Sequence, residues 1–483
     1  MANKSDILKV GLFPFANIED TYDSYIQMIS REFKKVSPNT DLDLVIGDKF
    51  NPYAPDLSEY LGADGFDILE FDMARKDDFH TKVLEVAIEP FRYLTPAVEA
   101  VKVEGGAHIG YPTLCCGNFI MEVKRSGELA IDMGDKDYDE FKNSAYVAEK
   151  YMVEPNKSHY TRLLGGKLDD SDGWYLPFIY LDAFIDVHGR QSLQQGIDDV
   201  LQGKPDPIVV QRLTEFSSLF PKKQLSTDQT IQAIVNGKIA YFYGFSEILG
   251  KILDASNGSL KAFGALTPTL GKEKLVLVFT DAIVINKVRF EQASEEKKKV
   301  IGQFAQFFTS ARIREAVVMG QDLNPPQIRY LLPSTVEFYQ GTNNLVYTEL
   351  YEMVREGVSS PSMTEKKRQD MEDVLTKCFT KKEKRERYHF SKGIPIDIDA
   401  SCSLNDILEE LDVEESTTAD EVIDERTLRH EVRGLKFWNL DGNSLKFTSK
   451  LSNLVPHQCE TQELQEQFAS SESSESANLT NFS

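Results

Sequence analysis

Cysteine is scarce in this chain, and the few cysteines follow no regular spacing. Five occur among 483 residues, and none belongs to a CxxC motif or a Cys/His array. This usage is typical of free thiols in a reducing compartment, and it gives no indication of structural zinc. We therefore expect neither a metal nor another cofactor.

Long apolar runs are also missing. No uninterrupted run reaches the roughly 18 residues that a membrane-spanning helix needs. The chain opens with a short polar stretch followed by a strand at residues 7–12, and lacks a basic region followed by an apolar segment. We therefore expect no signal peptide and a cytoplasmic location.

Positive charge is in short supply. The chain has 54 Lys and Arg against 77 Asp and Glu, for a formal net charge of −23. This balance disfavours nucleic acid and anionic membranes as partners. We expect a monomer that binds small molecules.

The N-terminal third alternates between strand and helix patterns. Residues 8–13 and 42–46 are apolar strands around a helical pattern at 22–33, and 66–72 is a third strand. Such alternation predicts an α/β fold with a largely parallel sheet, whose ligands bind beyond the carboxyl ends of the strands. Four candidate site residues fall at or after predicted strand ends: Phe13, Phe15, Asp72 and Cys116.

Two carboxylates stand out in the second half of the chain. Glu247 lies between a strand at 239–243 and a helix that begins at Ile248, and Asp281 lies inside the β-rich run 275–285. A carboxylate among apolar residues is costly unless it is hydrogen-bonded or faces a ligand. Asp281 is therefore either a ligand-binding residue or a structural one satisfied by backbone amides.

An adjacent pair of thiols ends the apolar stretch at 109–114. Cys115 and Cys116 are followed by Gly117 and Asn118, and then by another apolar segment. At a chain turn, a thiol can receive backbone N–H groups that stabilise a thiolate nucleophile. The alternative is that both thiols are small hydrophobic core residues.

Seven short segments, in this order, resemble the thiaminase I (thiamine pyridinylase) family from about residue 7 to residue 380. They are VGLFPF at 10–15, the strand ending at Asp72, YPTLCCGN at 111–118, YLDAFIDVHG at 180–189, GFSE at 244–247, FTD at 279–281 and YLLP at 330–333. The resemblance implies the two-lobed type II periplasmic-binding-protein fold with a hinged cleft. Residues 1–118 and 281–380 would form one lobe, and 119–280 the other. Residues 381–483 would be an acidic, partly disordered extension.

The resemblance also implies roles for individual residues. Cys116 matches the family's nucleophile and Glu247 its catalytic base. Asp72 and Asp281 match acidic residues that hold the aminopyrimidine.

Aromatic residues that line the family's cleft match Phe13, Phe15, Phe245 and Phe279. The bacterial enzymes are expected to have tyrosine at these four positions, so the hydroxyl groups are absent here. A further family tyrosine matches either Phe50 or Tyr53.

The function implied is cysteine-dependent transfer of the aminopyrimidine methylene group of thiamine to a small amine or thiol, with release of the thiazole. One alternative is a non-catalytic thiamine- or pyrimidine-binding protein on the same fold, because a fold alone does not fix function. Another is a papain-type cysteine hydrolase, which would need His108 or His188 beside the thiol.

Overall fold

The computed structural model describes residues 7–14, 22–47, 50–54, 56–125, 162–166, 175–217, 225–266 and 273–386. Phe15 lies outside these residues. So do the C-terminal extension beyond residue 386 and a hairpin predicted at 435–447.

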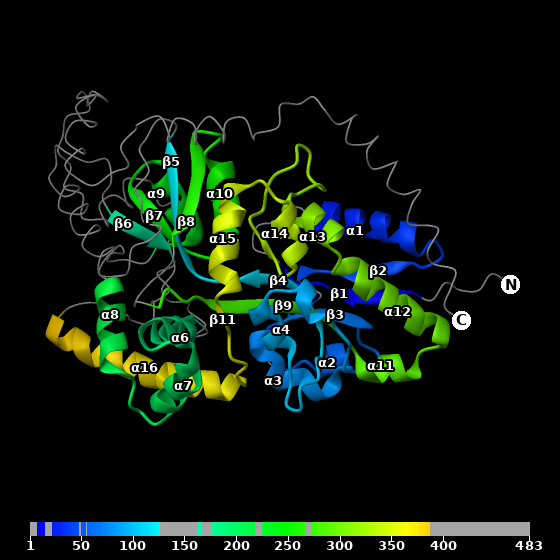
Figure 1. The fold of residues 1–483 in the computed structure, drawn as a ribbon, viewed down its shortest axis with the longest axis horizontal. Helices are drawn as coiled ribbons and strands as arrows, with labels where there is room; N and C mark the ends of the chain where they lie inside the picture. Colours follow the sequence, from blue (N-terminus) through cyan, green and yellow to red (C-terminus); the bar gives the residue numbers. More distant parts are fainter. Residues whose placement is uncertain are drawn as a thin grey trace. The chain divides into compact units, whose positions relative to one another are not determined.

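The first sheet has the strand order β10-β4-β9-β3-β1-β2, and β11 pairs with β9. Figure 1 labels all of these strands except β10. Its strands are β1 (Leu8–Gly11), β2 (Leu42–Val45), β3 (Ile68–Asp72), β4 (Tyr111–Cys116), β9 (Leu277–Ile285), β10 (Leu332–Pro333) and β11 (Val358–Ser359). Strand β1 is parallel to β2 and β3, whereas β9 is antiparallel to β3 and β4. The expectation of a largely parallel sheet was therefore wrong for the β9 side. The chain leaves this sheet at the carboxyl end of β4. When it returns, β9 begins at that same end of the strands and therefore runs antiparallel to β4 and β3.

The second sheet has the order β6-β7-β5-β8. Its strands are β5 (Phe119–Arg125), β6 (Arg162–Gly166), β7 (Ile239–Gly244) and β8 (Leu260–Leu266). Only Gly117 and Asn118 separate β4 from β5, so the thiol pair lies where the chain passes from one sheet to the other. Strand β9 belongs to the first sheet along its whole length, and the domain boundaries given above remain a prediction.

Helices accompany both sheets. Those before β7 are α1 (Tyr22–Val36), α2 (Ser58–Leu61), α3 (Lys76–Phe79), α4 (Thr95–Val101), α6 (Tyr175–His188), α7 (Leu193–Leu201), α8 (Pro207–Ser217) and α9 (Thr227–Val235). Those after it are α10 (Ile248–Ala255), α11 (Lys287–Gln292), α12 (Glu295–Phe308), α13 (Ala311–Val318), α14 (Val336–Gly341), α15 (Leu345–Arg355) and α16 (Glu365–Glu386). Short 3-10 helices are η3 (Met73–Arg75), η4 (His80–Lys82), η5 (Pro90–Arg92) and η6 (Arg190–Ser192).

The sequence pattern of α1 shows why these helices pack as they do. Tyr25, Met28, Ile29 and Phe33 recur at three- and four-residue intervals, and all four are buried. The ring of Phe33 packs at 5.2 Å from that of Phe304 on α12. This places α1 and α12 together beside the first sheet.

The apolar pattern predicts a helix over residues 363–379, and α16 extends beyond it. It packs against α6, α7 and α8 (Figure 1), with Met371 and Leu375 fully buried. It continues to Glu386 and so includes part of the charge run at 381–387. Such a charge run is typical of a solvated helix face or a linker, and its first six residues are helical.

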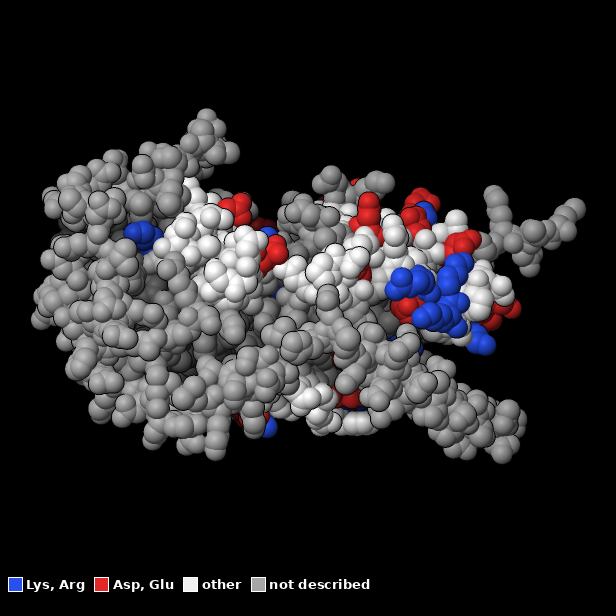
Figure 2. Space-filling model, turned by 90° about the horizontal axis from the view of Figure 1, so that it is seen from above, with Lys and Arg blue, Asp and Glu red and all other residues white. Residues whose placement is uncertain are grey.

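Among the described residues, no helix is both long and apolar enough to cross a membrane. On the face shown in Figure 2, Lys and Arg side chains gather beside Asp and Glu side chains at one end. Ion pairs on α1 join Arg31 and Lys35 to Glu32, and Lys34 pairs with Asp41. Exposed pairs of this kind contribute little stability, and they do not indicate a binding site.

Candidate functional site

Asp72 and Asp281 lie opposite each other on β3 and β9. Residues directly opposite on paired strands project from the same face. Asp72 is 8% exposed, and its Oδ1 accepts a hydrogen bond from the Ala74 N–H at 2.8 Å. Burial raises the pKa of Asp72 to about 6, although this hydrogen bond and the nearby Arg75 charge oppose the shift.

Asp281 is half-buried and lies within a group of negative charges. Burial raises its pKa well above the usual range, and the charges of Asp72, Glu70 and Glu247 raise it further. Two neighbouring carboxyl groups that both resist ionisation are typical of a functional site, where charge is arranged for a ligand rather than for stability.

The two adjacent thiols point to opposite faces of β4. Cys115 pairs with Thr280 and Cys116 with Phe279 in the β4–β9 register. The Cys115 Sγ lies 3.9 Å from the Thr280 Oγ1, and this buried thiol has a pKa raised by burial to about 12. Cys115 is therefore a core residue.

Cys116 occupies the face that carries Asp281, and it is half-buried. Burial raises its pKa well above the usual range. The charges of Asp281, Glu247 and Asp72 contribute in that order. Cys116 is therefore a protonated thiol at rest, and it needs a base before it can act as a nucleophile.

Glu247 lies in the turn between β7, a strand of the second sheet, and α10. Gly244 ends β7 with φ at 154°, and a Cβ there would lie 2.7 Å from the ring of Phe242, so glycine is required. The Ser246 hydroxyl donates a 2.6 Å hydrogen bond to the Tyr330 carbonyl. Glu247 is half-buried at the N-cap of α10, and burial raises its pKa to about 7.

Predicted aromatic residues surround these groups. The rings of Phe245 and Phe279 meet edge to face at 6.1 Å, and Phe178 of α6 packs edge to face on Phe279 at 5.1 Å. Phe13 follows β1 and meets the ring of Tyr53 edge to face at 5.7 Å.

The structure distinguishes Phe50 from Tyr53. Phe50 is fully buried, and a Cβ added at Gly11 would lie only 3.0 Å from its ring. Tyr53 is 42% exposed, yet desolvation raises its pKa well above the usual range, with further contributions from the charges of Asp72, Asp281 and Cys116. The ring contact with Phe13 places Tyr53 beside a predicted site residue, whereas Phe50 belongs to the core.

Glu70 is a site-supporting residue that the sequence analysis missed. Glu70 is fully buried. One of its carboxylate oxygens accepts a hydrogen bond from the Thr113 hydroxyl at 2.7 Å, and the other accepts one from the Phe13 N–H at 3.2 Å. Burial raises its pKa, which the nearby Arg314 charge opposes. The available signal was the spacing of Glu70 and Asp72, because residues two apart on a strand share a face.

Two carboxylates of the 180–189 segment, both on α6, accept hydrogen bonds from backbone N–H groups at and just before the start of β9. The Asp182 Oδ1 accepts the Leu277 N–H at 2.6 Å, and the Asp186 Oδ1 accepts the Leu275 N–H at 3.0 Å. They fix the start of the strand that carries Phe279 and Asp281, and so act on the site indirectly.

The two histidines considered for a hydrolase have other surroundings. His188 pairs with Asp206 at 3.3 Å and packs on Phe184, and His108 forms β-bridges with Val86 and Lys102. The side chains whose charges act most on Cys116 are carboxylates. Within the described ranges, no cluster of three or more His, Cys, Asp and Glu side chains is arranged to hold a metal ion.

No family model and no curated protein matches the chain. Solved structures do. Thiaminase I from Bacillus thiaminolyticus aligns with a TM-score of 0.55 and 16% identity, over 77% of this chain and 99% of that one. Clostridium botulinum thiaminase I in complex with thiamin gives 0.52 and 17%, over 77% and 100%. Maltose-bound MalE3 of T. maritima gives 0.52 and 12%, over the same shares.

These similarities establish the two-lobed type II periplasmic-binding-protein fold. They include enzymes as well as a maltose-bound protein. Because one fold supports both, the choice between catalysis and binding rests on the site residues.

Proposed function

We propose that this chain is a thiaminase I-like transferase, which moves the aminopyrimidine methylene group of thiamine to a small amine or thiol. The observation that carries the proposal is a half-buried Cys116 on the face of the first sheet that carries the paired Asp72 and Asp281. Burial raises its pKa, and the charges of Asp281, Glu247 and Asp72 raise it further. A thiol with a base of pKa about 7 near it has the chemistry of an activated nucleophile.

The electrostatics favour a cationic ligand. Burial raises the pKa values of Asp72, Asp281 and Glu247, so ionisation of these carboxyl groups is unfavourable unless positive charge lies nearby. A cation supplies the missing positive charge. Thiamine carries a thiazolium cation, whereas a neutral sugar offers no such compensation.

The proposed first half-reaction begins when Glu247 accepts the proton of the Cys116 thiol. The sulfur forms a bond to a carbon of the pyrimidine ring, and the ring electrons then break the bond between the methylene carbon and the thiazolium nitrogen. The thiazole leaves as a neutral molecule. Asp72 and Asp281 bind the amino group and ring nitrogens, and a protonated Asp281 can donate a hydrogen bond to a ring nitrogen as electron density shifts onto it.

In the second half-reaction, an amine or thiol forms a bond to the methylene carbon, and the proton of a thiol or of an N–H amine passes to solvent. The ring electrons return, the bond between the ring and the Cys116 sulfur breaks, and Glu247 returns the proton. The result is ping-pong transfer through a covalent pyrimidinyl-enzyme. Phe245 and Phe279 supply an apolar wall with aromatic faces for the flat rings.

The second candidate is a protein that binds thiamine or a related pyrimidine without reaction. Its support is that the fold is shared with a maltose-bound protein. The thiol and its carboxylates argue against it, because binding alone has no use for a nucleophile beside a base.

One experiment separates the two. Purified protein is incubated with thiamine and a pyridine-like base, and free thiazole and the pyrimidine–base product are sought by mass spectrometry, with Cys116→Ala as control. Both products should form with the natural chain and neither with the variant. Thiamine binding without products would support the binding protein, and absence of both would exclude each candidate.

A further inference from the structure

The loop that carries Tyr53 is anchored at the buried Phe50 and closed by one backbone hydrogen bond, from the Ala54 N–H to the Asn51 carbonyl at 3.1 Å. Residues 50–54 form turns rather than a helix or strand, and Tyr53 is 42% exposed. The Tyr53 N–H donates to the Asn51 Oδ1 at 2.9 Å, which is a local turn contact. The Tyr53 ring contacts Phe13, and fixing the backbone on either side of Tyr53 requires contacts from outside the loop.

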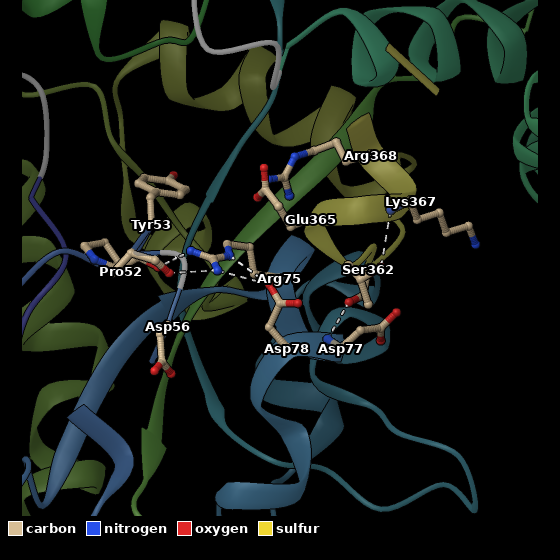
Figure 3. Close-up of polar contacts among 12 residues, drawn as sticks. Pro52, Tyr53, Asp56, Arg75, Asp77, Asp78, Ser362, Glu365, Lys367 and Arg368 are labelled. Atoms are coloured by element: carbon tan, nitrogen blue, oxygen red, sulfur yellow. Dashed lines mark hydrogen bonds and ion pairs between the residues drawn. The ribbon is translucent and has the colours of Figure 1, made fainter. Parts of the chain in front are cut away.

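The guanidinium group of Arg75 supplies these contacts (Figure 3). Its Nη1 donates to the Pro52 carbonyl at 2.9 Å, and its Nη2 donates to the Ala54 carbonyl at 3.1 Å. These are the carbonyls of the residues on either side of Tyr53. The Arg75 side chain is 3% exposed, so water competes little for these bonds.

Arg75 is itself held firmly. Its Nε donates to the Asp78 Oδ2 at 3.1 Å. The segment around it is tied to the chain before α16, because the Asp77 N–H donates to the Ser362 Oγ at 2.8 Å (Figure 3) and the Met363 N–H donates to the Ala74 carbonyl at 3.0 Å.

Arg75 also follows Asp72 closely along the chain, at the end of η3. Its charge lowers the pKa of Asp72 and that of Tyr53, against the larger effect of burial on each. Arg75 thus lies near Asp72, a predicted ligand residue, and also holds the loop that carries Tyr53.

These donors do not form a binding site for an anion. The Arg75 fork is engaged by two carbonyls and by Asp78, and the neighbouring Arg368 is paired with Glu365. The arrangement is suited to holding the protein's own backbone.

We propose that Arg75 is a positioning residue that fixes Tyr53, so that the phenol hydroxyl is directed at the aminopyrimidine held by Asp72 and Asp281. The proposal rests on the proposed function for the identity of the ligand. It gives Tyr53 a particular importance, because the other predicted aromatic residues of the site are phenylalanines and supply no hydroxyl.

Arg75→Lys tests this directly. Lysine keeps the charge but lacks the planar fork that reaches both carbonyls. We expect kcat/KM for thiamine to fall on the order of tenfold to a hundredfold, as for a misplaced contact group. Arg289→Lys is the matched control, because Arg289 also donates to a carboxylate and a backbone carbonyl, those of Asp67 and Ala63. It should leave kcat/KM unchanged.

A double-mutant cycle distinguishes positioning from a general loss of stability. In a Tyr53→Phe background the hydroxyl is already missing, so Arg75→Lys should lower kcat/KM by less than about threefold. Equal fold-losses in both backgrounds would overturn the proposal. If Arg75→Lys fails to fold, Asp78→Asn serves instead, because it loosens the guanidinium without changing Arg75, and the same coupling to Tyr53→Phe is required.

Hydrogen exchange followed by mass spectrometry tests the clamp without any ligand. Amides of residues 50–54 should exchange faster in Arg75→Lys than in the natural chain, and Arg289→Lys should not change them. Unchanged exchange in Arg75→Lys would overturn the clamp whatever the activity. Faster exchange in a protein that neither binds nor converts thiamine would support the clamp and refute the proposed function.

Discussion

Binding of a cation at this site should expel protons, and the effect can be measured. Asp72 and Glu247 have pKa values raised to about 6 and about 7, so each holds a proton at a pH where an ordinary carboxyl group has lost it. A thiazolium near them favours the ionised forms. Thiamine binding to Cys116→Ser, which cannot turn over, should therefore strengthen as the pH rises.

The size of the effect follows from the pKa values. A unit charge about 5 Å from Glu247, at an effective dielectric constant of about 20, contributes ~3 kcal/mol, or ~2 pKa units. At pH 7, Glu247 is about half protonated, so binding should release about half a proton from it, with a smaller share from Asp72. The affinity should increase on the order of tenfold between pH 6 and pH 8.

Titration calorimetry in phosphate and in Tris gives the number of protons released, because the two buffers differ in ionisation enthalpy. Glu247→Gln should lower that number at pH 7, and it should also weaken binding, because the attraction between the carboxylate and the cation is lost. An affinity that stays constant from pH 5 to pH 8, or proton uptake instead of release, would refute the reasoning. Maltose, a neutral ligand, should release no protons if it binds at all.

Three further outcomes follow from the site and the fold. Cys116→Ser should abolish turnover while Cys115→Ser retains much of it, and an adduct mapped by intact and peptide mass to Cys115 would contradict the assignment. Glu247→Gln should cut kcat by ~10²-fold or more at saturating thiamine, as for a lost general base; steady-state kinetics with calorimetry decide this, and weakened binding with unchanged kcat would make it only a binding residue. A chain ending at Glu386 should fold and keep its activity, whereas removal of α16 should lower the melting temperature, because its buried residues pack on α6 and α7.

Local pattern was sufficient for most of the elements. The helix predicted at residues 22–33 is α1, and the strand at 239–243 is β7, with only terminal differences. The direction of β9 was not predictable in this way, because it depends on the excursion to the second sheet rather than on its own residues. The two-lobed fold was expected from the resemblance and is confirmed by the solved structures.

The site was only partly accessible from the sequence. The spacing of Asp72 and Asp281 along the chain gives no indication that β3 and β9 pair them directly. The choice between Phe50 and Tyr53 was open because both lie in an irregular segment. It is decided by the close approach of Phe50 to Gly11, a contact across 39 positions of the chain. The hydrogen bonds from Arg75 to this loop have no local signal either, because they join η3 to a loop more than 20 residues away along the chain.

The proposed chemistry depends on groups from both sheets, and the fold contains a direct link between them. Cys116, Asp72 and Asp281 come from the first sheet, whereas Glu247 follows β7 of the second. The buried Ser246 hydroxyl, next to Glu247, bonds to the Tyr330 carbonyl just before β10. A buried hydrogen bond of this kind costs free energy to break without a replacement. The position of the base relative to the thiol is therefore supported before a ligand arrives, which is the preorganisation that general-base catalysis requires.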